Sequence, residues 1–171
     1  MTRTLVVMGV SGCGKTTLAR ALAAALGWDF VEGDTLHPEA NLARMAAGIP
    51  LGDADRQPFL ERVADALRAG RPRGVVVTCS ALKRRYRDLI RARAGDVRFV
   101  LPVLDRARIA ARLALRRDHF MPAALLDSQF ADFEPPAPDE RVVEIDGGAD
   151  TGTQVGAALA ALRAETPLPP P

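Results

Sequence analysis

The fold is decided by the stretch TLVVMGVSGCGKT, residues 4–16, in which a short apolar run leads into a glycine-rich turn. Residues 9–16 match the pattern GxxxxGK[ST] in full, and Leu18, Leu22 and Leu26 then repeat at helical spacing. Strand, loop and helix in this order are the context in which the pattern binds phosphate, because backbone N–H groups and the helix N-terminus converge on the anion. We therefore expect a phosphate-binding loop; the alternative is an ordinary glycine turn that caps a helix.

Each residue of this loop has an expected role. Lys15 reaches the β- and γ-phosphates of a nucleotide, and the Thr16 hydroxyl binds Mg²⁺. The Cys13 side chain is a small filler. The residues expected to contact the nucleotide are Gly9, Val10, Ser11, Gly12, Cys13, Gly14, Lys15, Thr16 and Thr17.

The same alternation of apolar strands and amphipathic helices continues along the chain. Strands are expected at Thr4–Met8, Asp29–Val31, Gly74–Cys79, Val97–Leu101 and Val142–Ile145. Helices are expected at Thr16–Leu26, Pro38–Ala47, Asp55–Ala69, Ala81–Arg93, Asp105–Arg116, Pro122–Phe130 and Gly152–Ala164. Continuously apolar strands that alternate with helices predict an α/β fold of three layers, with a five-stranded parallel sheet covered on both faces.

Length and composition limit the remaining possibilities. The chain has 171 residues, a net charge of +2 and 5% aromatic residues, which indicates one compact domain over residues 1–165 and argues against nucleic-acid binding. Residues 166–171 are expected to form a disordered tail, and the charged segment of about residues 116–140 a lid. No apolar run approaches the roughly 20 residues of a membrane span. The two cysteines suit a reducing compartment, so we expect a cytoplasmic protein.

The segments after the second and third strands favour a small-molecule kinase. The chain lacks the NKxD and DxxG motifs of GTPases, and Cys79-Ser80 stand where many P-loop ATPases carry a magnesium-binding aspartate. Glu32 and Asp34 end the second strand. Two residues apart on an extended segment, they would point the same way and share one site for metal and acceptor. We expect Glu32 to hold the metal together with Thr16.

Several further motifs, in order, resemble those of gluconokinases of the small P-loop type. They are GDxLHPxxN from Gly33, MxxGxPLxDxDRxP from Met45, CSALKxxYRD from Cys79, RxxxRxxHF from Arg112, and SQF and EP from Ser128 and Glu134. The resemblance implies a nucleoside-monophosphate-kinase-like fold with a lid, ATP-dependent phosphorylation of D-gluconate to 6-phosphogluconate, Mg²⁺, and a homodimer. Phe59, Cys13 and Phe133 depart from the family's usual Trp, Ser and Leu, which concerns acceptor fit more than the reaction.

Phosphoryl transfer needs a carboxylate that orients the acceptor hydroxyl or takes its proton. Asp34 is the candidate, and its alternative role is to cap the helix expected near Pro38. His37 either hydrogen-bonds a hydroxyl of the acceptor or braces the turn.

A sugar acid also needs a fixed cation for its carboxylate. We expect Arg56, Lys83 and Arg87, the last two four residues apart on one predicted helix; the alternative is a solvated basic face. Ser80 is expected to face the same pocket, whereas Asp53 and Asp55 are expected to cap the next helix.

Arg112 and Arg116 are expected to close over the phosphates, unless they belong to an exposed, salt-bridged helix. His119 is expected to touch the acceptor, and adenine to lie between these arginines and the loop at residues 146–151. Two alternatives stay open. Glu32 and Asp34 resemble the acidic pair of shikimate kinases, although CSALK replaces their GGxxx-Arg motif, so the chain could be a shikimate or other sugar-acid kinase. It could also be a non-catalytic regulator that binds ATP and a metabolite.

Overall fold

The computed structural model describes residues 2–115 and 123–164. Five strands form one sheet in the order β2-β3-β1-β4-β5, and every neighbouring pair is parallel. The strands are β1 (Thr4–Val7), β2 (Asp29–Val31), β3 (Val75–Thr78), β4 (Arg98–Val103) and β5 (Val143–Asp146). The predicted five-stranded parallel sheet is therefore confirmed.

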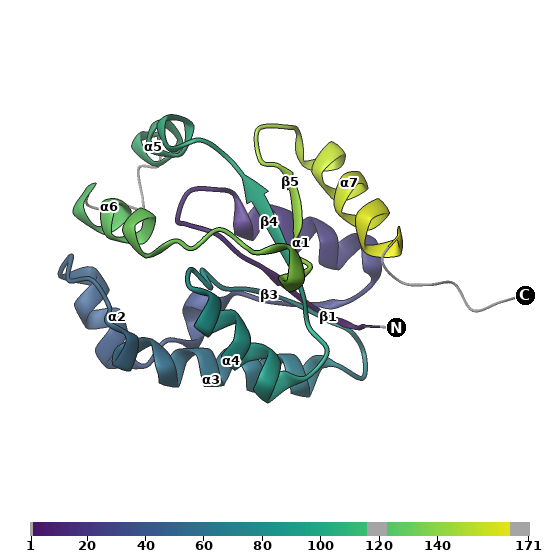
Figure 1. Ribbon diagram of the computed structural model, residues 1–171, viewed down its shortest axis with the longest axis horizontal. Coiled ribbons are helices and arrows are strands. Elements are labelled where there is room, and N and C mark those ends of the chain that lie inside the picture. The colour runs from purple at the N-terminus through teal and green to yellow at the C-terminus, as the bar shows by residue number, and fades with distance from the viewer. Residues whose placement is uncertain (1, 116–122, 165–171) are drawn as a thin grey trace, which may run out of the picture.

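Helices cover both faces of this sheet (Figure 1). They are α1 (Lys15–Leu26), α2 (Glu39–Ala46), α3 (Asp53–Gly70), α4 (Arg84–Ala94), α5 (Arg106–Ala114), α6 (Ala123–Asp132) and α7 (Thr151–Ala164), with 3₁₀ turns η1 (Gly33–Leu36) and η2 (Pro138–Glu140). Each strand and helix begins and ends within three residues of its predicted bounds. No helix in these described parts of the chain is long and apolar enough to cross a lipid bilayer.

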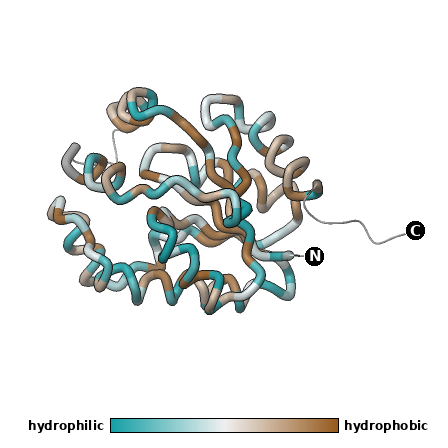
Figure 2. Tube along the Cα trace, in the orientation of Figure 1, coloured by the Kyte–Doolittle hydropathy of each residue, from teal (hydrophilic) through white to brown (hydrophobic). Residues whose placement is uncertain are grey.

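The core has a layer on each side of the strands. α3 and α4 bury Phe59, Val63 and Ile90 against one face, and α1 and α7 bury residues such as Leu22 and Ala158 against the other. Figure 2 shows the apolar residues gathered along the central strands. All residues of β1 and β3 are buried, as expected for parallel strands with helices on both faces.

The direction of the strands decides where a site can form. Because the strands are parallel, their carboxyl ends share one edge, where ligands bind in open α/β sheets. α2, α5 and α6 lie toward the end of the molecule to which the arrow of β4 points (Figure 1). The residues 116–122 and 165–171 lie outside the described part of the chain, and with them Arg116, His119, the start of the expected lid and the whole of the expected tail at residues 166–171.

Candidate active site

The phosphate-binding loop joins β1 to α1 and is shaped by glycine. Gly9, Gly12 and Gly14 have φ angles of 130°, 83° and 101°, in the region that L-residues with side chains rarely adopt. Gly14 is the N-cap of α1, and no side chain caps the helix, so its first N–H groups face the loop. The Lys15 ammonium curls back and donates to the Val10 carbonyl at 3.0 Å. The loop is thus built to receive an anion at a helix N-terminus.

Three oxygen-bearing side chains meet beside the loop. Thr16 Oγ1 donates to Glu32 Oε2 at 2.8 Å, and Thr78 Oγ1 donates to the other carboxylate oxygen. Glu32 reaches this position because Gly33 packs against β3: a Cβ at Gly33 would lie 1.7 Å from the Thr78 carbonyl oxygen. Hydroxyl and carboxylate oxygens are the ligands that Mg²⁺ prefers, so the predicted pair fits that ion.

A cavity of about 240 Å³ opens between the loop and the start of α7. It is lined by Gly12, Gly14, Thr17, Leu18, Arg112, Ala149, Asp150, Thr151 and Gln154. Arg112 bridges its two walls, because its guanidinium donates to the carbonyls of Cys13 at 3.4 Å and Gly147 at 2.9 Å. This is the region, between the α5 arginine and the loop after β5, where the sequence places adenine.

Asp34 lies in the turn η1 rather than on an extended segment. Our expectation of one extended segment through Glu32 and Asp34 is therefore wrong, because the 3₁₀ turn begins at the glycine between them. The capping alternative for Asp34 is also wrong, since the N-cap of α2 is Pro38 and has no side-chain cap. Within residues 2–115 and 123–164 no hydrogen bond or ion pair engages the Asp34 carboxylate, which is exposed.

His37 is held by stacking and by an amide. Its ring lies parallel to that of Phe59 with centroids 3.7 Å apart, and Asn41 Nδ2 lies 3.3 Å from His37 Nδ1. Because an amide nitrogen only donates, Nδ1 accepts and Nε2 carries the proton in the neutral ring. Burial lowers the pKa of His37 below 6.5, and the nearby Arg56 acts in the same direction while Asp34 opposes it. His37 is therefore neutral at physiological pH, with an N–H to donate.

The groups just described surround the end of β3. Burial raises the pKa of Cys79 to about 12, and Lys15, Arg56 and Asp34 are the charges that act on its thiol. Cys79 is therefore a neutral filler between the phosphate loop and the η1 turn. Ser80, which follows it, is half-buried, and its carbonyl accepts from the Gly9 N–H at 3.1 Å, which ties the end of β3 to the phosphate loop.

Arg56 and Lys83 come together beyond Ser80. Arg56 lies near the start of α3, and Lys83 is the N-cap of α4. Both pair with Asp132 at the end of α6, at 3.6 Å and 3.2 Å. Lys83 also lies 3.3 Å from Asp53, to which Tyr86 donates its hydroxyl proton. Asp53 thus belongs to this charged cluster rather than to a helix cap, and its pKa falls to about 2, chiefly through the Tyr86 hydrogen bond.

Asp55 is the residue that caps α3, as expected, because its Oδ2 accepts from the Gly52 N–H at 2.9 Å.

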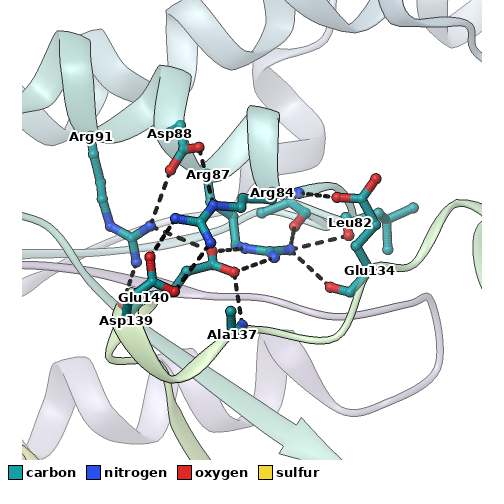
Figure 3. Close-up of polar contacts among 10 residues, drawn as sticks. Leu82, Arg84, Arg87, Asp88, Arg91, Glu134, Ala137, Asp139 and Glu140 are labelled. Atoms are coloured by element: carbon teal, nitrogen blue, oxygen red, sulfur yellow. Dashed lines mark hydrogen bonds and ion pairs between the residues drawn. The ribbon is translucent and has the colours of Figure 1, made fainter.

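Arg87 does not reach this cluster, and its assignment as an acceptor-binding residue is wrong. α4 begins at Arg84, so Lys83 precedes the helix and the two residues do not share a helical face. The Arg87 side chain is 0% exposed and forms two hydrogen bonds of 2.6 and 2.8 Å with Glu140 (Figure 3). It also donates to the carbonyls of Ala81, Leu82 and Glu134, each within 3.2 Å. Arg87 therefore fixes the Ser80–Lys83 loop through hydrogen bonds to its backbone.

The structure adds residues to which we assigned no role. Gln129 of α6 accepts from the Ser11 N–H at 2.7 Å, and so binds the phosphate loop directly. Asn41 ties His37 to the Asp55 carbonyl. The SQF and GDxLHPxxN motifs contain Gln129 and Asn41, so the sequence indicated these two residues but not the groups that they contact. Asp132 lies outside every motif, and nothing local signals its ion pairs.

Known proteins place this chain among small kinases. A family model described as an AAA domain matches residues 5–136. A gluconokinase of Gluconobacter oxydans (strain 621H) is 52% identical over 149 residues, which cover 85% of this chain and 83% of the relative. The thermosensitive gluconokinase of Escherichia coli (strain K12) is 46% identical over 145 residues, covering 82% and 77%.

A solved structure agrees with these relatives. The crystal structure of a gluconokinase from Sinorhizobium meliloti 1021 superposes with a TM-score of 0.86 at 42% identity, covering 94% of this chain and 91% of the other.

Proposed function

Because the chain belongs to the gluconokinase family, we propose that it transfers the γ-phosphoryl group of ATP to D-gluconate and releases 6-phosphogluconate and ADP. One structural observation supports this proposal. The phosphate-binding loop and the cation pair of Arg56 and Lys83 are both contacted by α6, through Gln129 and Asp132. A polyphosphate site and a carboxylate site thus lie beside one helix, as a kinase of sugar acids requires.

The nucleotide end uses the loop, α1 and α5. We propose that the backbone N–H groups from Gly12 to Thr17 bind the phosphates, with Gly9, Val10 and Ser11 shaping the turn. Lys15 leaves the Val10 carbonyl to bind the β- and γ-phosphates. Arg112, already against the loop, neutralises charge that develops during transfer. Arg116 is proposed to do the same from residues that the structure does not describe.

Thr16 and Glu32 would hold Mg²⁺, which their oxygen atoms suit. The bound ion neutralises the charge of the phosphates. The hydrogen bond between Thr16 and Glu32 places their oxygen atoms side by side at the phosphate loop.

At the acceptor end, Asp34 is proposed to orient the attacking hydroxyl and to accept its proton. The hydroxyl oxygen forms the new bond to the γ-phosphorus while the bond from that phosphorus to the β,γ-bridging oxygen breaks, so ADP departs with the electron pair. His37 donates from Nε2 to another hydroxyl, and Ser80 and His119 contact the polyol. Arg56 and Lys83 bind the carboxylate, because charge-assisted hydrogen bonds from two sides fix an anion.

The first experiment measures ADP release with Mg-ATP and a panel of D-gluconate, related sugar acids, shikimate and nucleoside monophosphates. We expect selective turnover of gluconate and none with Lys15→Ala, which removes the cation of the phosphate site. Turnover of another acceptor alone would contradict the acceptor assignment. Silence across the panel would contradict the kinase and favour a regulator, an alternative that the gluconokinase relatives do not favour.

Lys83→Ala is expected to raise the KM for gluconate about tenfold or more, because one hydrogen bond to a charged group is lost. The KM for ATP should change less than about twofold, since Lys83 contacts Asp53 and Asp132 rather than the loop. Steady-state kinetics, with gluconate and ATP varied in turn, measure the two KM values. Arg84→Ala, the exposed neighbour paired with Asp139, is the control and should behave as the wild type (Figure 3). Equal effects on both KM values would show that the carboxylate site is misplaced.

The homodimer stays a prediction of the family resemblance, and the cytoplasmic location and the closure of a lid stay predictions from the sequence. Sedimentation equilibrium measures the first directly, with a mass of twice 18.3 kDa expected.

A further inference from the structure

Asp132, the last residue of α6, occupies the place that the proposed reaction gives to the acceptor carboxylate. Its Oδ1 lies 3.2 Å from Lys83 Nζ, and its Oδ2 lies 3.6 Å from Arg56 Nη2. One carboxylate thus bridges the two cations with one oxygen to each. A carboxylate on a substrate would bind the same pair in the same way.

The two cations have anchors that do not depend on Asp132. Arg56 Nε donates to the Leu51 carbonyl at 3.2 Å, and the Arg56 side chain is 10% exposed. Lys83 keeps its contact with Asp53 at 3.3 Å and is 20% exposed. Asp132 comes from another segment and is 30% exposed. The cations are therefore fixed while their partner can leave.

The charges around Tyr86 favour an anion in its place. The cations Arg56, Lys83 and Arg85 all lie 5.5–5.8 Å from the centre of the Tyr86 ring. In the described chain their ion-pair partners are Asp53 and Asp132. Departure of Asp132 removes one of the two carboxylates from this cluster, which is costly for the buried Arg56 unless another anion enters. A sugar acid supplies that anion, and a neutral polyol does not.

The same helix, α6, also contacts the phosphate loop. Gln129, three residues before Asp132, accepts from the Ser11 N–H at 2.7 Å, and its own amide lies 3.4 Å from Ser11 Oγ. The end of α6 thus contacts both the phosphate loop, through Gln129, and the cation pair, through Asp132.

We propose that Asp132 is an intramolecular competitor of the acceptor carboxylate and sets the affinity for the acceptor. Gluconate enters by exchanging its carboxylate for that of Asp132 between Arg56 and Lys83. This inference rests on the proposed function, because it needs an acidic acceptor at that pair.

The test is the neutral isostere Asp132→Asn. The KM for gluconate should fall about three- to tenfold, the range that two partly exposed ion pairs provide. The kcat and the KM for ATP should change less than about twofold. Asp127→Asn is the matched control, because Asp127 lies on the same helix, is 59% exposed and pairs only with Arg106 among the described residues; its kinetics should equal the wild type. Thermal midpoints confirm that each variant is folded, and Asp132→Ala gives a second variant with the same expected direction.

Acetate distinguishes competition from a structural role. With its cation pair vacant, Asp132→Asn should be inhibited by acetate against gluconate at several-fold lower concentration than the wild type. A higher KM for gluconate in the variant would make Asp132 an acceptor ligand, and an unchanged KM would show that it does not compete; either result overturns the proposal. Absence of gluconate turnover in the wild type would instead refute the proposed function, before any variant is compared.

Discussion

Asp34→Asn is expected to lower kcat for gluconate phosphorylation by about 10²- to 10⁴-fold, the range that a positioned general base contributes. The amide still accepts a hydrogen bond but does not take a proton at neutral pH, so orientation survives in part and the proton transfer does not. The KM values for gluconate and ATP should stay within about threefold, because neither the cation pair nor the phosphate loop is changed.

The structure indicates that this substitution does not disturb the fold. Asp34 is exposed in η1, and its carboxylate has no hydrogen-bond partner in the described residues, so the thermal midpoint should not move. Glu39→Gln is the control, because it neutralises another exposed carboxylate in the first turn of α2. Activity of Asp34→Asn within tenfold of the wild type would remove Asp34 as the base.

Features that depend on neighbouring residues could be predicted from the sequence. The phosphate loop is one contiguous motif, and its glycines, lysine and threonine sit where that motif places them. The sheet follows from short apolar runs, because a strand buried on both faces must be apolar throughout. Thr16 and Glu32, from different elements, lie in contact as expected, because both follow strands that end at the same edge.

The predictions were wrong where the exact residue at which a turn or a helix begins decides how two nearby residues are placed. The interpretation of Glu32 and Asp34 assumed extended backbone, and the 3₁₀ turn at Gly33 separates them. That turn is required by the close approach of Gly33 to Thr78, a contact between segments 45 residues apart. Lys83 and Arg87 were assigned to one helical face, but α4 starts after Lys83.

Long-range charge pairs were not accessible from the sequence. Arg87 was indistinguishable from its neighbours Arg84, Arg85 and Arg91, because the property that sets it apart is a carboxylate 53 residues away. Burial of an arginine is tolerated only with such a partner.

The same pair gives the largest expected effect on stability. Glu140→Gln should lower the free energy of unfolding by about 3–5 kcal/mol, because it leaves the Arg87 guanidinium buried without its counter-charge. In a protein of this length the thermal midpoint should fall by roughly 10 °C. Asp139→Asn is the control: Asp139 pairs with Arg84 at 2.5 Å on the exposed surface, and its loss should cost less than about 1 kcal/mol (Figure 3).

The pH dependence of stability should follow Glu140. The Arg87 hydrogen bonds hold the pKa of Glu140 at about 2, against 4.5 for a free glutamate. A carboxyl whose pKa is lowered by folding stabilises the folded state above its unfolded pKa, so this contribution is complete above about pH 4.5 and is lost as the pH falls toward 2. Urea unfolding of the wild type between pH 7 and pH 3 should show that loss, and Glu140→Gln should lack it.

A double substitution separates the role of the charges from the role of the contacts. Arg87→Met with Glu140→Leu removes both charges, and should restore much of the stability lost in Glu140→Gln, because a buried ion pair contributes little more than apolar side chains of similar size. Its activity should not recover. Arg87, unlike Glu140, donates to the carbonyls of Ala81 and Leu82, and Ala81 has the strained φ of 43° that turns the chain between Ser80 and Lys83. A stable double variant should therefore show a raised KM for gluconate with an unchanged KM for ATP. A wild-type KM in that variant would show that the loop keeps its shape without Arg87.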